Sequence, residues 1–132
     1  MSRPSRAAGP EAAKRILLVD DERTVVFSLG RFLRLHGFEV DAAQRQAEAE
    51  RLLDTHRYDV VLTDLRLTGT GGTEGLTIIE HARRVHPNAL IVLLTAYGTE
   101  EVLDAARDLG VDTILSKPVL LDHLLEVVSP QG

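Results

Sequence analysis

The sequence contains no cysteine among its 132 residues. This absence excludes thiol catalysis, disulfide scaffolds, cysteine-based zinc fingers and iron–sulfur ligation. Basic residues are also the minority, 15 against 20 acidic ones, and the formal net charge of −5 argues against direct binding of the domain to nucleic acid. No apolar run approaches the ~20 residues that span a bilayer, and the first residues include no apolar signal segment. We therefore expect a soluble, cytoplasmic protein without a membrane partner.

The length of the chain corresponds to a single domain. A chain of this size buries roughly two-thirds of its unfolded surface, so it needs no disulfide or metal to fold. Residues 1–13 are rich in alanine, proline, arginine and glycine and have no apolar period. We predict a flexible tail over residues 1–13 and the domain over residues 14–132.

Short apolar runs alternate with amphipathic segments over the rest of the chain. The runs at 16–19, 60–62, 90–94 and 113–116 are typical of parallel strands buried on both faces. Residues 38–42 alternate between apolar and polar instead, as in an edge strand. Apolar residues at helical spacing predict five helices, around 25–33, 43–53, 76–85, 102–109 and 120–128. Five strand–helix pairs predict an α/β fold, a (βα)5 doubly wound parallel sheet.

Polar side chains follow four of these predicted strands, at the edge where open α/β sheets bind ligands. They are Asp20 and Asp21, then Asp64, then Thr95, and last Lys117. Two carboxylates ~4 Å apart repel by ~4 kcal/mol at an effective dielectric of about 20. Such a cluster predicts a bound cation, and oxygen ligands together with waters suit Mg²⁺.

A carboxylate beside Mg²⁺, an ammonium group and a hydroxyl group is equipped to attack a phosphoryl group. Aspartyl phosphate is a known product of covalent catalysis. The metal and Lys117 would neutralise the charge on the transferring oxygens, and Thr95 would hydrogen-bond one of them. The pattern therefore predicts a phosphoryl acceptor site.

Four motifs, in the order ILLVDD, VVLTDL, LIVLLTAYG and TILSKP, resemble the receiver domain of bacterial two-component response regulators. The resemblance extends from about Lys14 to Val128. It implies a flavodoxin-like sheet with strand order 2-1-3-4-5, and a phosphoprotein that acts in phosphorelay signal transduction. The implied donor is a sensor histidine kinase or a phosphotransfer protein.

The output that the resemblance implies is a shift in the face formed by the fourth helix, fifth strand and fifth helix. That face would serve a downstream output protein, an effector domain missing from this chain, or a homodimer. The resemblance also assigns the acceptor and the metal ligands. Asp64 resembles the phosphoacceptor, and Asp21 resembles the direct acidic Mg²⁺ ligand. Asp20 acts largely through water, while Asp64 itself and the backbone carbonyl of Arg66 complete the ligands.

Further roles follow from the same match. Thr95 resembles the switch hydroxyl and Lys117 the lysine that binds the phosphoryl group. Pro118 resembles the proline held in a cis bond after that lysine. Arg66 and Tyr97, two residues after the acceptor and after the threonine, are candidate modulators of the phosphoryl lifetime.

The sequence departs from the family at three places. Ile114 stands where the family usually has an aromatic residue three positions before the lysine, which puts coupling through an aromatic rotamer in doubt. Thr68 replaces a frequent proline four residues after the acceptor. The loop from Leu65 to Gly75 is also about three residues longer than usual, and its glycines indicate flexibility.

Two other functions remain open on the sequence. A receiver-like module that binds partners without phosphorylation is supported by Ile114 and opposed by the complete acidic set. A phosphatase or hydrolase with an aspartyl-phosphate intermediate needs a second acid two residues after the nucleophile, where Arg66 stands. We therefore expect no enzyme, only a domain that promotes its own phosphorylation and dephosphorylation.

Overall fold

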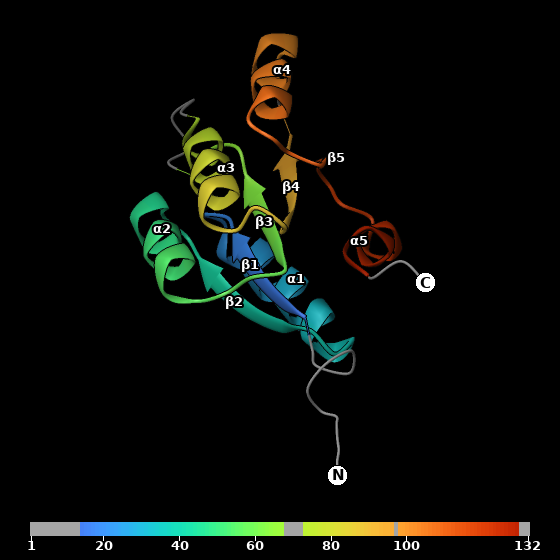
Figure 1. Ribbon diagram of the computed structural model, residues 1–132. Coiled ribbons are helices and arrows are strands. Elements are labelled where there is room, and N and C mark those ends of the chain that lie inside the picture. Colours follow the sequence, from blue (N-terminus) through green and yellow to red (C-terminus); the bar gives the residue numbers. More distant parts are fainter. Residues whose placement is uncertain (1–13, 68–72, 97, 130–132) are drawn as a thin grey trace.

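The computed structural model describes residues 14–67, 73–96 and 98–129, in which strands and helices alternate (Figure 1). The strands are β1 (Arg15–Val19), β2 (Glu39–Ala43), β3 (Val60–Asp64), β4 (Leu90–Thr95) and β5 (Thr113–Ser116). The helices are α1 (Arg23–Leu35), α2 (Gln46–Thr55), α3 (Glu74–Val85), α4 (Glu100–Asp108) and α5 (Leu121–Val128). The predicted tail over residues 1–13 lies outside the described residues.

The five strands form one parallel sheet in the order β2-β1-β3-β4-β5. This order confirms the flavodoxin-like topology. The interior strand β1 is fully buried from Ile16 to Val19 because helices cover both of its faces, whereas β2 at the edge mixes buried and exposed positions. The register pairs Val19 with Thr63 and Thr95 with Ser116, so the carboxyl ends of neighbouring strands lie level.

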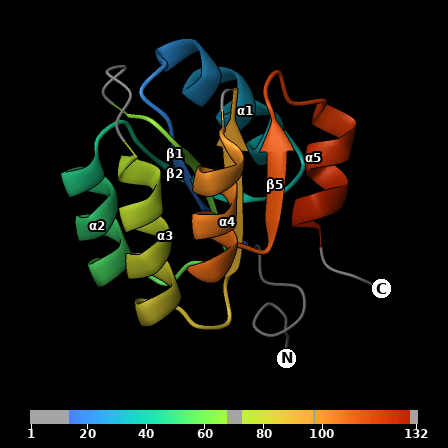
Figure 2. The ribbon, with the colours of Figure 1, turned by 90° about the horizontal axis from the view of Figure 1, so that it is seen from above.

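The helices cover the sheet in two layers (Figure 2). Helices α2, α3 and α4 lie on one face, and α1 and α5 lie on the other. Alternate residues of β1 supply the two apolar cores, Leu17 and Val19 on the first side and Ile16 and Leu18 on the second. No helix within the described residues has the length and apolar character to cross a membrane.

All five predicted helices are present, with one shift in position. The second helix was predicted around residues 43–53 because Ala43, Ala47, Leu52 and Leu53 fit a weak apolar stripe, but Ala43 is the last residue of β2 and Ala47 is exposed. The helix starts later, at Gln46, and its buried face is formed by Ala49 and Leu53. Alanine is too common on helix surfaces for its spacing alone to distinguish the two faces.

A polar cluster connects Asp41 of β2 with Arg15 at the start of β1 and with Tyr58, two residues before β3. The carboxylate oxygen Oδ2 of Asp41 accepts hydrogen bonds from the Tyr58 hydroxyl at 2.7 Å and from Arg15 Nε at 3.0 Å. Burial alone would raise the pKa of Asp41, but these two bonds and the charge of Arg15 lower it below its ordinary value. Burial and the neighbouring Asp41 carboxylate raise the pKa of Tyr58, so the phenol stays protonated as the donor.

The replacement Asp41→Asn is expected to reduce the free energy of unfolding near neutral pH by about 1–2 kcal/mol, because it removes the charge from two hydrogen bonds. A lowered folded-state pKa stabilises the fold above the unfolded-state value of about 3.9 and loses that effect as the pH falls through the folded-state value. Urea unfolding of both proteins from about pH 7 down to about pH 3 measures the difference. A difference that stays constant over this range would contradict the assigned pKa shift.

Candidate functional site

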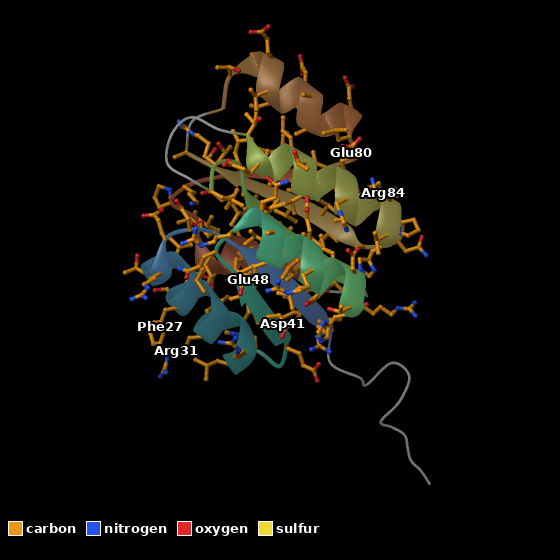
Figure 3. The ribbon with its side chains drawn as sticks, turned by 90° about the vertical axis from the view of Figure 1, so that its left-hand side faces the viewer. Phe27, Arg31, Asp41, Glu48, Glu80 and Arg84 are labelled. Atoms are coloured by element: carbon orange, nitrogen blue, oxygen red, sulfur yellow. The ribbon has the colours of Figure 1, made fainter. Side chains whose placement is uncertain are left out.

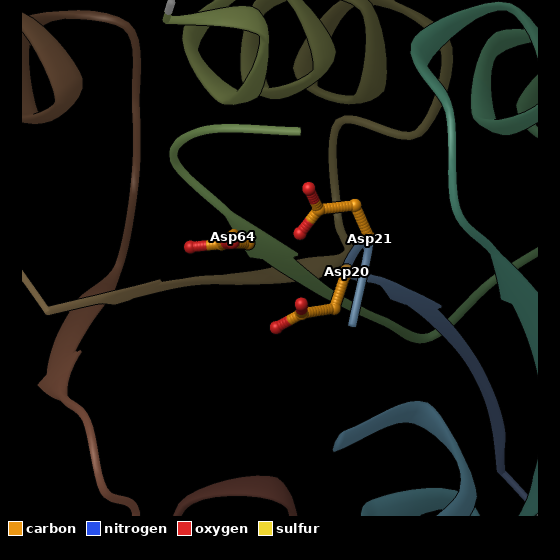
Figure 4. A group of neighbouring side chains, drawn as sticks. All are labelled: Asp20, Asp21 and Asp64. Atoms are coloured by element: carbon orange, nitrogen blue, oxygen red, sulfur yellow. The ribbon is translucent and has the colours of Figure 1, made fainter. Parts of the chain in front are cut away.

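Three aspartates gather where the two central strands end (Figure 4). Asp20 follows β1 directly and Asp64 is the last residue of β3, and these strands are neighbours in the sheet. Asp20, Asp21 and Asp64 each offer a carboxylate oxygen, and the three oxygens lie within 4.8 Å of one another. The structure thus brings together the three carboxylates that the sequence placed at the strand ends.

The Asp20 side chain is buried and both of its oxygens are engaged. Oδ1 accepts a hydrogen bond from the Glu22 backbone N–H at 3.0 Å, and Oδ2 accepts one from Lys117 Nζ at 2.6 Å. A buried carboxylate is stable only with such partners. Asp20 is therefore fixed in position and holds the lysine.

Lys117 faces three carboxylates at once. Its Nζ lies 2.6 Å from Asp20, 3.4 Å from Asp64 and 3.6 Å from Glu22. Burial alone would lower the pKa of Lys117, but the hydrogen bond to Asp20 and the charges of Asp20 and Asp64 raise it above its ordinary value. The ammonium group is therefore charged, yet one positive charge does not balance the surrounding acids.

The two aspartates nearest the opening show the resulting imbalance. Burial raises the pKa of Asp64, the charge of Asp20 raises it further, and Lys117 opposes both effects only in part. Burial and the charge of Asp20 also raise the pKa of Asp21. A divalent cation would relieve this repulsion, and a donor set made only of oxygens fits a hard cation such as Mg²⁺ or Ca²⁺.

The Asp64 carboxylate lies at a pocket of about 280 Å³. Asp21, Glu22, Asp64, Leu65, Arg66, Thr95, Ala96 and Lys117 line it. Thr95 ends β4, one strand away from Asp64, and is almost fully buried. Arg66 is thus at the pocket as the sequence suggested, whereas Tyr97 lies outside the described residues.

The residues around Lys117 follow the sequence pattern closely. Lys117 N–H donates to the Thr95 carbonyl at 3.0 Å, which fixes the lysine beside the end of β4. The peptide bond between Lys117 and Pro118 is cis, as the resemblance implied. Ile114 on β5 packs into the same apolar cluster as Val102 and Leu103 of α4. An aliphatic side chain therefore occupies the contact between β5 and the helix in front of it.

Two residues near the acceptor were not singled out from the sequence. Glu22 contacts Lys117, and its only signal was its place directly after Asp21. Gly75 was read as part of a flexible loop, but it is buried in the first turn of α3. A Cβ atom there would lie 2.3 Å from the Asp64 carbonyl oxygen and 2.8 Å from the Leu65 Cα, so this position requires glycine. Nothing in the glycine-rich run distinguished Gly75 from its neighbours.

Comparisons with known proteins identify the family of the chain. A family model described as the response regulator receiver domain matches residues 16–129. A response regulator receiver protein of Anaeromyxobacter sp. (strain Fw109-5) is 36% identical over 114 residues, which cover 86% of this chain and 47% of that protein. The chain thus spans about half the length of this curated relative.

Solved structures show the same fold. A response regulator of Burkholderia pseudomallei with a phosphorylated aspartic acid, calcium ion and citrate is 28% identical, with a TM-score of 0.80 over 88% of this chain and 66% of that one. A CheY-like receiver domain protein of Methanospirillum hungatei JF-1 is 29% identical, with a TM-score of 0.82 over 87% of this chain and 90% of that one.

The replacement Gly75→Ala is expected to lower both stability and phosphoryl uptake, because the added methyl group would push on the backbone that carries Asp64. The matched control is Gly30→Ala in α1, where the new Cβ atom would meet only the end of the flexible Arg34 side chain. Thermal unfolding and the rate of Asp64 phosphorylation measure the two effects. Equal behaviour of the two variants would show that the close approach at Gly75 is unimportant.

The replacement Asp64→Asn is expected to raise the free energy of unfolding without divalent cations by roughly 1 kcal/mol or more, because it removes one of the repelling charges. Added Mg²⁺ should stabilise the wild-type protein more than the variant, because the variant has lost a ligand. Asp108→Asn on the exposed surface of α4 is the control and should change neither quantity. If Asp64→Asn were less stable than the wild-type protein without metal, repulsion among the three carboxylates would not be destabilising the folded protein.

Proposed function

The chain belongs to the response regulator receiver domain family, and we propose that it accepts a phosphoryl group on Asp64 in an Mg²⁺-dependent reaction. The donor would be a sensor histidine kinase or a phosphotransfer protein. The observation that carries this proposal is the position of Lys117 Nζ, 2.6 Å from Asp20 and 3.4 Å from Asp64, beside a pocket that opens over the acceptor.

The two carboxylate oxygens of Asp64 have different environments, and this difference indicates which of them acts as the nucleophile. Oδ1 accepts a hydrogen bond from the Leu65 N–H at 2.8 Å, whereas Oδ2 faces Lys117. We assign the attack on phosphorus to Oδ2. The new O–P bond forms as the P–N bond of the donor phosphohistidine breaks, and its electron pair leaves with the imidazole nitrogen, which takes up a proton.

Asp21, Asp64 and the backbone carbonyl of Arg66 would hold the metal ion, and Asp20 would act on it largely through water. When bound, Mg²⁺ supplies neutralisation of the charge on the transferring oxygens. Lys117, directly after β5, would supply a second positive charge, because its Nζ reaches both Asp20 and Asp64. The Burkholderia response regulator contains a phosphorylated aspartic acid and a calcium ion, which supports by analogy an acceptor aspartate and a divalent cation in this chain.

The phosphorylated state would redistribute two polar contacts. Lys117 would exchange its bond to Asp20 for one to a phosphoryl oxygen, and the Thr95 hydroxyl would donate to another. Movement of Thr95 toward the phosphoryl group would open space behind β4, next to Ile114 and α4. Arg66 and Tyr97 would modulate hydrolysis of the phosphoryl group, Arg66 through its charge at the pocket.

The switched surface would be the face of α4, β5 and α5. Its occupants would be a downstream output protein, an effector domain outside this chain, or a second copy in a homodimer. We further propose that the domain promotes only its own phosphorylation and dephosphorylation, since Arg66 stands where a hydrolase would need its second acid. A binding module that works without phosphorylation is not favoured, because the complete acidic set surrounds Lys117.

Incubation with acetyl phosphate and Mg²⁺, followed by intact mass spectrometry, tests the acceptor assignment. The wild-type protein and Asp108→Asn should each gain one phosphoryl group, and Asp64→Asn should gain none. Lys117→Ala should still bind Mg²⁺ but accumulate far less adduct, because the negative charge of the product would be uncompensated. An adduct on Asp64→Asn, or an unchanged adduct level in Lys117→Ala, would overturn the respective assignment.

A further inference from the structure

Helix α1 concentrates positive charge in a protein that is acidic overall. Its 13 residues include Arg23, Arg31 and Arg34 and no acidic residue, although the whole chain has a net charge of −5. Helix α4, on the other face of the sheet, shows the opposite balance with four acidic residues and one arginine. The surface therefore has a basic pole along α1, which begins beside the acidic Asp21 and Glu22.

An exposed aromatic ring lies within this basic pole (Figure 3). Phe27 is 68% exposed and projects from the outer side of α1 close to Arg31. Residues 23, 27 and 31 are spaced four apart, so they form a row along one side of the helix. At the usual helical rise, the two arginines flank the phenylalanine at about 6 Å on each side.

The arginines of this row remain available for a partner. Arg34 donates to the Val40 carbonyl oxygen at 2.8 Å, which ties it to β2. Within residues 14–67, 73–96 and 98–129, by contrast, neither Arg23 nor Arg31 forms an ion pair or a side-chain hydrogen bond. The fold does not require their charges, and it leaves most of the Phe27 ring in water.

The row is separate from the apolar groove on the neighbouring side of α1. That groove, of about 540 Å³, lies between α1 and the start of α5 and is lined on α1 by Thr24, Val25, Ser28 and Leu29. Phe27 and Arg31 are not among its lining residues. A partner seated in the groove would therefore leave the outer row uncovered.

We propose that the row of Arg23, Phe27 and Arg31 binds an acidic amphipathic segment of a partner protein. Phe27 would insert among apolar side chains, and the arginines would pair with carboxylates on either side of them. Arginine and aromatic residues are enriched at the energetic centres of protein interfaces. This surface contains none of the acceptor residues, so the inference goes beyond the proposed function.

Charge complementarity selects this occupant over two others. Nucleic acid would also meet the acidic residues that dominate the remaining surface, which the net charge of −5 makes unfavourable. A two-fold contact with a second copy would place the same arginines against each other. The acidic face of α4 on a second copy is complementary in charge, and self-association therefore has its own outcome in the test.

The test uses three helical peptides of equal length that share one leucine stripe. Glutamate, glutamine or lysine residues occupy positions four residues before and after the central leucine. Titration into the ¹⁵N-labelled full chain should give shift changes on residues 23–35 with the glutamate peptide, at least tenfold tighter than with the glutamine peptide. Phe27→Ser should weaken this binding at least fivefold. The double variant Arg23→Glu/Arg31→Glu should lose the glutamate peptide and bind the lysine peptide instead.

Two exposed positions elsewhere provide matched controls. Arg51→Glu on α2 makes the same charge change as either single arginine replacement, and Leu120→Ser removes an apolar side chain that is 75% exposed, so both should leave peptide binding within twofold. Equal binding of the glutamate and glutamine peptides, or shift changes mapping to the groove, would overturn the proposal. Sedimentation that shows self-association abolished by Arg31→Glu would identify a second copy as the occupant and overturn it as well. Phosphorylation of Asp64 by acetyl phosphate should be the same in Phe27→Ser, in Arg31→Glu and in the two controls, which keeps this result separate from the proposed function.

Discussion

The site at the strand ends depends on one interaction, the pairing of the Lys117 ammonium group with the carboxylates around it. The ammonium group pairs with the buried Asp20 carboxylate at 2.6 Å, and it faces Asp64 and Glu22 as well. The parallel sheet makes this possible, because all of its strands end at one edge. β5 lies two strands from β3, a distance of about 10 Å at the usual strand spacing. A long flexible stem ending in a compact charge covers that distance, which is why lysine suits the position.

The same arrangement leaves the site short of positive charge. One ammonium group does not neutralise Asp20, Asp21 and Asp64, and the raised pKa values of Asp21 and Asp64 are the consequence. The folded protein thus holds repulsion that a divalent cation can relieve. The scaffold around the acceptor differs on its two sides. Gly75 of α3 packs directly on the Asp64 backbone, whereas α4 presents only Ala106 as a fully buried residue.

Much of the fold and of the acceptor site follows from the sequence. Continuous apolar runs identified the buried strands, and the polar residues directly after them identified the site, because parallel strands end together. Features that depend on close packing could not be predicted from the sequence in this way. Gly75 was indistinguishable from the other glycines of its segment, and Ala47 fitted a helical stripe although it faces water. The exposure of Phe27 could likewise not be predicted from the sequence, since a phenylalanine at helical spacing is more often buried.

A crystal structure with Mg²⁺ and beryllofluoride would test most directly whether charge compensation by Lys117 organises the site. We predict beryllofluoride on Asp64 Oδ2, a metal ion held by Asp21, Asp64 and the Arg66 carbonyl, and Lys117 Nζ in contact with a fluorine atom. In that state Lys117 should have left Asp20, whose carboxylate would turn to the water shell of the metal. A lysine that kept its bond to Asp20, with no metal ion among the aspartates, would contradict this view of the site.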